Sequence, residues 1–340
     1  MSNGARLYGL DVAKGILILL VTIGHALQYI FPDHSGFLND PLFRFIYMFH
    51  MPAFMAISGY LFHITSDSGR AQKAVKYRFV GAFFPGLAWG GLPILAYLWR
   101  NRATLPNSTA LLFFIQRLES LWFLWALLFC TLFVYFIRRI SGSAIILAGA
   151  TICLLAVPDD SISLILDLKM CKFMLPFFVG GYLCKNIELN ANSRRITLWI
   201  AACVFIYCGI FWEDQCFVYF SGSNFWEVGA IPFIMRLSAG AAGSILIVEA
   251  SSHAFGNTVL WFTEIGKSSL VIYILQMQLF LVAHHLIPAG LFDLVSYWQR
   301  WGGAVLFASI LTLLLNFLAN RLLKNTILNL LLFGIGKKSK

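Results

Sequence analysis

The sequence predicts an all-α integral membrane protein, a polytopic bundle of about ten transmembrane helices with the N- and C-termini in the cytoplasm. Of the 340 residues, 59% are hydrophobic and 12% are charged, whereas soluble domains usually carry about 25% charged residues. No hydrophilic stretch is long enough to make a separate soluble domain. Residues 1–340 are therefore expected to form a single transmembrane domain, with a core at 6–325 and a short basic cytoplasmic tail at 325–340.

Ten apolar segments account for the predicted spans, because a transmembrane helix needs about 20 mostly apolar residues. The first segment is not expected to be a cleaved signal peptide, since its exit at residues 28–32 lacks the small-residue cleavage pattern. We place the spans at residues 15–31, 43–63, 79–99, 120–137, 143–157, 171–184, 196–212, 229–248, 267–287 and 303–323.

The distribution of Lys and Arg predicts the orientation, because these residues are enriched in cytoplasmic loops. With the N-terminus inside, most of the 25 Lys and Arg residues fall in inner loops. Tryptophans such as Trp122 and Trp212 fall at the outer boundaries, as in an interfacial belt. The net charge of +10 is interpreted as topogenic. No nucleic-acid partner is expected, because no basic run is interleaved with exposed aromatic residues.

No metal centre is predicted. The seven cysteines lie mostly in apolar runs and form no C-x-x-C pair, so they indicate neither a disulfide framework nor a metal site. The adjacent His284 and His285 have no carboxylate or cysteine nearby in the sequence, so they are not expected to hold a metal.

A polar stripe runs along the first span. Lys14 and His25 are eleven residues apart, which is within roughly 20° of three full helical turns and separates them by about 16 Å along the axis. Asp11 and Thr22 join the same face. Asp11 and Lys14 could simply anchor the helix at the inner interface, but that alternative leaves His25 unexplained. A polar face at this depth is expected to meet protein or a water-filled cavity.

The second span carries a histidine at a matching depth. His50 lies about seven residues, or ~10 Å, inside the outer end, and His25 lies at a similar depth. Pro52 has no N–H to donate, so a kink beside His50 is expected. The pattern predicts that both histidines line one cavity. The simpler alternative for His50 is a packed histidine bonded to a neighbouring carbonyl.

Three further polar residues are candidates for contact with a substrate. Arg44 opens the second span, Arg236 lies about seven residues inside the eighth, and Gln276 lies in the middle of the ninth. A buried Arg is always charged and needs a dipolar or anionic partner. Gln276 could equally form hydrogen bonds between helices. Lys172, at the mouth of the sixth span, is expected to face solvent.

Several of these residues belong to motifs. The specific ones are Arg6-Leu-Tyr-Gly-Leu10-Asp11-x-x-Lys14-Gly15, Gly24-His25, Phe49-His50-Met51-Pro52 and Ser58-Gly59-Tyr60. Weaker, hydrophobic ones are Leu121-Trp122-Phe123-Leu124, Leu175-Pro176-Phe177-Phe178, Gly181-Tyr182-Leu183 and Gly266-Lys267-Ser268-Ser269-Leu270. Over nearly its whole length the chain resembles the acyltransferase 3 family of membrane O-acetyltransferases, especially its fucose 4-O-acetyltransferase-like branch.

The resemblance implies a multi-pass enzyme of the bacterial inner membrane. It would move acetyl from acetyl-CoA, a donor substrate rather than a bound cofactor, to a hydroxyl of a cell-envelope polysaccharide or lipid-linked sugar. Its partners would be acetyl-CoA, that acceptor and membrane lipid. His25 would be the general base, with His50 beside it; a covalent acetyl-histidine is an open alternative. The coenzyme would be held by Asp11, Lys14 and Arg78, and the acceptor by Arg44, Arg236 and Gln276.

Two positions depart from the family pattern. Most members have Arg where this chain has Lys14, which keeps the charge but loses bidentate contact with phosphate. Many members have His where this chain has Gln276. The alternative function is a membrane transporter or flippase for a glycan or anionic solute, which would use the same buried cations without chemistry. The sequence has no internal repeat relating its halves, which many transporters have.

Overall fold

The computed structural model is helical over most of the residues that it describes, which are 3–31, 36–101, 120–159, 168–185, 187, 189–218, 221–223, 225–253, 257–286, 295–322 and 326–335. The side chains of His284 and His285, and the last residues of the predicted basic tail, lie outside this part. The α-helices are α1 (Asn3–Tyr29), α2 (Pro41–Tyr47), α3 (His50–Asp67), α4 (Ala71–Asn101), α6 (Trp122–Ile140), α7 (Ala144–Ala156), α8 (Leu168–Cys184), α9 (Ala191–Ile210), α10 (Phe225–Val228), α11 (Ala230–Ser252), α12 (Asn257–Lys267), α13 (Ser269–Leu286), α14 (Tyr297–Leu322) and α15 (Thr326–Phe333). Two short 3-10 helices, η1 (Phe37–Asn39) and η3 (Asp214–Cys216), lie in loops.

Each of the ten predicted spans overlaps a helix, so the polytopic helical fold is confirmed. In the described part, the stretches long and apolar enough to cross a membrane are Tyr8–Tyr29, Pro41–Asp67, Trp122–Ile140, Ala191–Ile210, Ala230–Ser252 and Tyr297–Arg321. The pair of α12 and α13, bent by 75°, adds one more if it crosses as a single span. The other predicted spans lie on α4, α7 and α8, and the last two have only 13 and 17 residues. The count of ten and the side of each terminus stay predictions.

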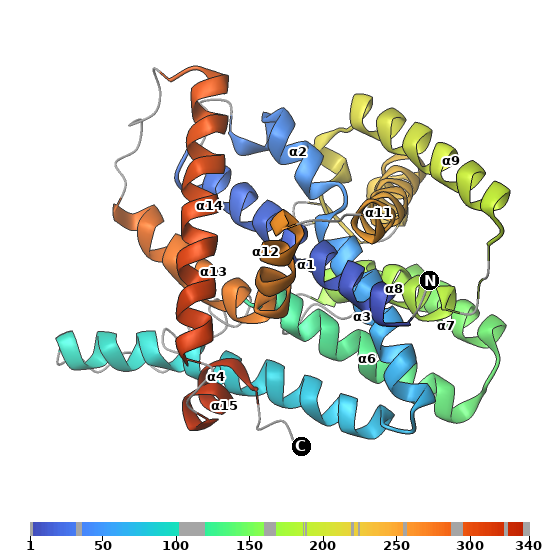
Figure 1. Ribbon diagram of the computed structural model, residues 1–340, viewed down its shortest axis with the longest axis horizontal. Helices are drawn as coiled ribbons and strands as arrows, with labels where there is room; N and C mark the ends of the chain where they lie inside the picture. The colour runs from blue at the N-terminus through green and yellow to red at the C-terminus, as the bar shows by residue number, and fades with distance from the viewer. Residues whose placement is uncertain are drawn as a thin grey trace.

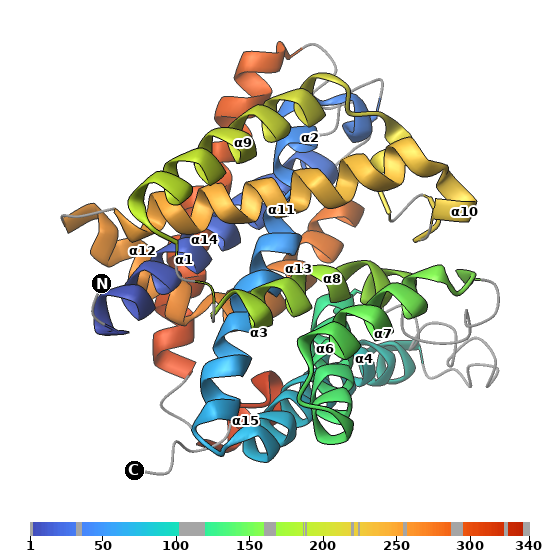
Figure 2. The same cartoon turned by 90° about the vertical axis from the view of Figure 1, so that its right-hand side faces the viewer.

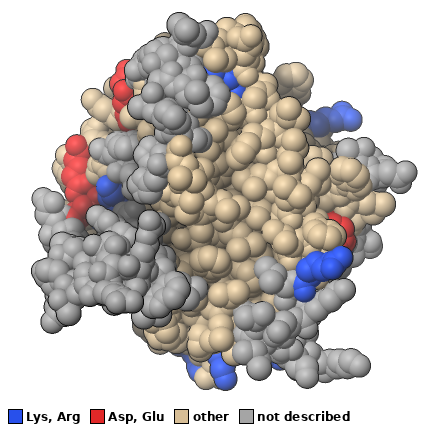
Figure 3. Space-filling view, turned by 90° about the vertical axis from the view of Figure 1, so that its left-hand side faces the viewer, with Lys and Arg blue, Asp and Glu red and all other residues tan. Residues whose placement is uncertain are grey.

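The helices divide into a centre and a periphery. In the most apolar window of each helix, 67% of the residues are buried in α1 and in α2–α3, against 11% in α9 and 28% in α14. Figure 1 shows α9 and α14 on opposite sides of α1. On one face of the molecule, uncharged side chains cover the middle and charged ones lie toward the edges (Figure 3). Such a surface suits a lipid-facing belt around a buried α1 and α3.

Two helix crossings depend on glycine. A Cβ atom added to Gly15 or Gly266 would collide with a backbone carbonyl of the other helix where α1 meets α12. The same holds for Gly59 and Gly181 where α3 meets α8 (Figure 2). Small residues allow such close approach, which is the main source of helix association in lipid. Four of the glycines in the sequence motifs therefore serve packing.

The second predicted span is broken, as expected from Pro52. Helix α2 ends at Tyr47 and α3 begins at His50, so Pro52 falls in the first turn of α3, where its missing N–H removes no helical hydrogen bond. The break places His50 at a helix end beside a local gap in the helical ladder.

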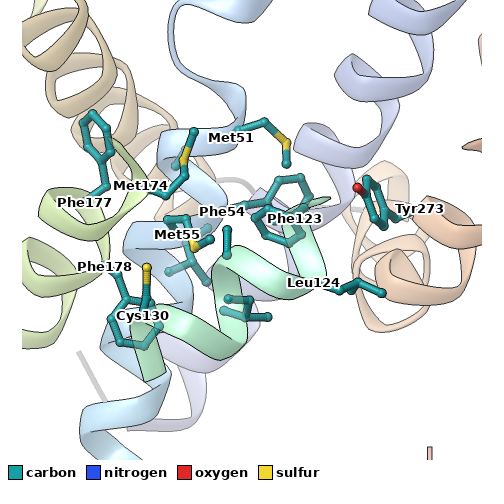
Figure 4. Close-up of a cluster of buried hydrophobic side chains, with 14 of the residues drawn as sticks. Met51, Phe54, Met55, Phe123, Leu124, Cys130, Met174, Phe177, Phe178 and Tyr273 are labelled. Carbon is teal, nitrogen blue, oxygen red and sulfur yellow. The ribbon is translucent and has the colours of Figure 1, made fainter. Parts of the chain in front are cut away.

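An apolar core lies below that break. Met51, Phe54 and Met55 of α3 pack against Phe123 of α6 and Met174 of α8, among others (Figure 4). Side chains of this core, including Met51 and Met174, also line the cavity described next. The floor of the cavity is therefore apolar.

Candidate active site

A cavity of about 430 Å³ opens among α1, α2, α3, α8, α11 and α13. Its volume suits a small organic ligand. Both predicted histidines line it, so the prediction that His25 and His50 share one cavity is supported by the geometry. The lining also includes Val21, Gln28, Tyr29, Phe37, Phe43, Tyr47, Met48, Met51, Trp122, Met170, Phe173, Met174, Trp212, Cys216, Phe217, Arg236 and Tyr273.

His25 is held by packing. Its ring centre lies 5.7 Å from that of Phe280, edge to face, and 5.9 Å from that of Tyr29. The buried Nδ1 atom has no hydrogen-bond partner among the described residues. The residue before His25 is Gly24, where a Cβ atom would collide with the ring of Tyr47 on α2. His25 therefore lines the cavity with one ring nitrogen that has no protein partner among the described residues.

His50 is held by a hydrogen bond. Its side chain is buried, and Nδ1 lies 2.7 Å from the carbonyl oxygen of Ile46. A carbonyl only accepts, so Nδ1 carries the hydrogen, and Nε2 is the unprotonated nitrogen of the neutral ring. The ring also packs edge-on against Tyr47, with centres 4.7 Å apart. His50 therefore bonds to a neighbouring carbonyl, as the simpler alternative predicts, and also lines the cavity.

Arg236 is the cation of the cavity. Only 1% of its side chain is exposed. Its Nη1 donates to the carbonyl of Gly222 at 2.8 Å and to Oγ of Ser221 at 3.4 Å. The guanidinium carbon lies 5.3 Å from the ring centres of Phe173 and Phe233. These contacts fix the position of a permanent positive charge in the wall of the cavity that the two histidines also line.

A buried ionic network supports the loop that holds Arg236. Lys172 donates to Oδ1 of Asp159 at 2.7 Å and also to the carbonyl of Val157. Asp159 also accepts from the backbone N and Oγ of Ser223 at 2.7 and 2.6 Å. Burial alone would raise the pKa of Asp159, but its bonds to Lys172 and Ser223 outweigh burial and lower it. The expectation that Lys172 faces solvent is wrong, because 1% of it is exposed.

Comparison with known proteins agrees with this architecture. A family model described as an acyltransferase domain, that of the acyltransferase 3 family, matches residues 7–321. The chain belongs to the acyltransferase 3 family. Nodulation protein NolL of Sinorhizobium fredii is 29% identical over 311 residues, which cover 86% of this chain and 81% of that protein. Nodulation protein NolL of Mesorhizobium japonicum is 27% identical over 332 residues, covering 88% and 82%. No solved structure matches.

Family membership makes this chain a membrane acyltransferase, which decides against the transporter alternative. The shared motifs of the acyltransferase fall into two groups in the structure. One group, around His25 and His50, lines the cavity. The other, around Gly59, Gly181 and Gly266, forms helix crossings.

Two predicted acceptor-binding residues of the acyltransferase lie outside the cavity lining. Arg44 donates to the carbonyl of Leu38 at 2.6 Å and to the side chains of Asn39 and Asp214 at 2.9 and 3.0 Å. It therefore ties η1 to η3 at the cavity rim. Gln276 is fully buried and accepts from Oγ1 of Thr22 at 2.5 Å. That contact joins α13 to α1, as the helix-gluing alternative predicts.

The predicted coenzyme-binding residues are also separate from the cavity. Lys14 pairs with Asp11 at 2.7 Å, and both side chains are partly exposed. The cavity reaches along α1 only to Val21, seven residues or about 10 Å beyond Lys14. Leu17 is fully buried between them. Arg78 of α4 is not part of the lining. The lining of this cavity therefore includes neither Lys14 nor Asp11.

The sequence did not predict that aromatic side chains line much of the cavity. Trp122 and Trp212 line it, and 5% of Trp212 is exposed, so Trp212 does not belong to an interfacial belt. Tyr273 of α13 contributes a buried phenol. The available signal was weak, because a tryptophan near a span boundary is typical of both an interface and a cavity mouth.

Proposed function

We propose that this acyltransferase moves acetyl from acetyl-CoA to a hydroxyl of a cell-envelope polysaccharide or lipid-linked sugar in a bacterial inner membrane. The observation that carries the proposal is one cavity lined by His25, His50 and several aromatic side chains. Aromatic faces such as those of Tyr47 and Trp122 suit the apolar faces of a sugar ring. Histidine suits proton transfer from a hydroxyl near neutral pH.

Histidine is a better candidate than the one thiol in the cavity lining. Burial raises the pKa of the Cys216 thiol above its usual range, and a protonated thiol is a poor nucleophile. The sulfur also lies in a loop, at η3. His25 has a buried ring nitrogen, Nδ1, with no hydrogen-bond partner among the described residues. We therefore assign proton transfer to the histidines.

His25 acts as the base and His50 as the group that holds the acceptor. The acceptor hydroxyl gives its proton to His25 while its oxygen attacks the thioester carbonyl carbon. The carbon–sulfur bond then breaks, and the coenzyme leaves as a thiol that takes the proton back from His25. His50, whose Nδ1 is engaged with Ile46, offers Nε2 as a hydrogen-bond acceptor to a neighbouring hydroxyl. This step needs no resident cofactor.

Two measurements test the proposed reaction. Purified protein in nanodiscs should transfer radiolabelled acetyl from acetyl-CoA to envelope glycans or to lipid-linked sugars extracted from the host. Mass spectrometry of surface polysaccharides should show acetyl groups in the host that disappear when the gene is deleted. Unchanged acetylation after deletion, together with no transfer in vitro, would refute the donor and the acceptor class.

A further inference from the structure

Two of the three guanidinium nitrogens of Arg236, Nε and Nη2, have no hydrogen-bond partner among the described residues. The Nη1 atom is bonded to Gly222 and Ser221, whereas Nε and Nη2 are buried. Asp159 and Glu227 act on the guanidinium electrostatically, yet neither reaches those two nitrogens. A buried charged donor without a partner is costly, so a partner supplied from elsewhere would be strongly favoured.

The two free nitrogens lie on one edge of the guanidinium. The N–H groups of Nε and Nη2 point the same way, at the spacing of the two oxygens of a carboxylate or phosphate. The rings of Phe173 and Phe233 lie 5.3 Å from the guanidinium carbon. The network of Lys172 and Asp159 holds Ser223, next to the Gly222 carbonyl that accepts from Nη1. The edge is therefore fixed before any ligand arrives, which lowers the entropic cost of binding.

Arg236 lines the cavity of the two histidines, whereas the pair of Lys14 and Asp11 lies at the other end of the polar stripe of α1. An anion bound here would thus belong to a molecule that shares the cavity with the histidines. In the proposed reaction that molecule is the acceptor.

We propose that the Nε–Nη2 edge of Arg236 binds an acidic, two-oxygen group of the acyl acceptor and so holds its hydroxyl beside His25 and His50. This inference rests on the proposed function for the identity of the acceptor. The group is a carboxylate if it belongs to the sugar, as in a uronic acid. It is a phosphate if it belongs to the lipid link.

Direct binding tests the proposal without any transfer reaction. Tryptophan fluorescence, to which Trp122 and Trp212 of the cavity contribute, would follow titration of purified protein in nanodiscs with octyl glucoside, octyl glucuronide and a short polyprenyl phosphate. We expect at least one anionic probe to bind about 10- to 100-fold more tightly than octyl glucoside, as charge-assisted hydrogen bonds imply. Preference for the glucuronide assigns the charge to the sugar, and preference for the prenyl phosphate assigns it to the lipid.

Variants assign that preference to Arg236. Arg236→Gln should remove it, and Arg236→Lys should keep part of it, because Lys retains the charge but loses the fork. Arg321→Gln, at an exposed arginine of α14, should bind as the unmodified protein does. If Arg236→Gln fails to fold, the preference for anionic probes in the unmodified protein and in Arg236→Lys still tests the proposal.

The proposal is overturned if both anionic probes bind no more tightly than octyl glucoside. It is equally overturned if a folded Arg236→Gln keeps the preference. Failure of acetyl transfer with retained, Arg236-dependent anion binding would instead refute the proposed reaction and leave this site standing.

Discussion

Replacing Lys172 with Met should destabilise the protein measurably, because it breaks a buried ion pair on one side only. Lys172 is 1% exposed and Asp159 is 16% exposed, with 2.7 Å between their charged atoms. Removing one partner of a buried pair usually costs about 3–5 kcal/mol. Asp159 keeps two bonds from Ser223 and some access to water, so we expect a smaller loss of about 2–3 kcal/mol in the free energy of unfolding.

A double-mutant cycle measures the pair itself. Lys172→Met, Asp159→Asn and the double variant would be unfolded in mixed detergent micelles. The control is Lys76→Met, at an exposed lysine of α4. Its free energy of unfolding should lie within about 0.5 kcal/mol of that of the unmodified protein. We expect the double variant to lose less than the two single losses added together, by at least about 1 kcal/mol.

The same variants have a functional consequence. Asp159 fixes the backbone at Ser223, next to the Gly222 carbonyl that accepts from Arg236. Lys172→Met should therefore also weaken binding of the anionic probe. Additive losses, or a Lys172→Met protein as stable as the Lys76→Met control, would refute the network and support the solvent-facing position expected from the sequence.

Four further results are expected. Gly59→Ala should cost about 1–3 kcal/mol or more in thermal or chemical unfolding, since α3 and α8 must separate, while Gly149→Ala, where a Cβ meets open space, should not destabilise. Lys14→Arg should keep activity and Lys14→Ala should raise the KM for acetyl-CoA, whereas equal loss in both would contradict a charge-based role. Because the folded-state pKa of Asp159 is lowered, its ion pair should contribute fully above about pH 4 and be lost as the pH falls through the folded value; Asp159→Asn should flatten that acid dependence. A single cysteine at Arg138 should react with membrane-permeant reagents only, and labelling from the periplasm would contradict the predicted orientation.

The fold was predictable to the extent that lipid imposes it. Hydrophobic length and the scarcity of charge predict helices, because backbone groups in a bilayer must be satisfied within each segment. The break before His50 was predictable from Pro52. The lengths of the helices were not predictable. Helices α7 and α8 are short, and their placement depends on packing against α6 and α3.

The site was partly predictable for the same physical reason. His25, His50 and Arg236 stand out because polar groups are expensive at that depth, and all three line one cavity. Whether Arg44 and Gln276 bind the acceptor or hold the fold together depends on partners that are distant in the sequence. Arg44 meets Asp214 and Gln276 meets Thr22, and neither contact leaves a periodic trace in the sequence.

The network of Lys172 shows the same limit more sharply. A lysine beside a span boundary is typical of an exposed anchor. Its actual partners, Asp159 and through it Ser223, come from two loops that the fold brings together. Only the three-dimensional arrangement converts three separately ordinary surface residues into a buried support for the cavity.

The most direct test of the account is acetyl transfer by His25→Ala. The substitution makes the span more apolar, so membrane insertion and the helix crossings of α1 should persist, which size-exclusion chromatography and unfolding would check. Loss of a general base typically costs about 10²–10⁴-fold, so transfer from acetyl-CoA should fall by at least 100-fold, while His50→Gln should fall less and act mainly on the KM of the acceptor. Near-normal transfer by a well-folded His25→Ala protein would contradict the assignment of the cavity as the active site.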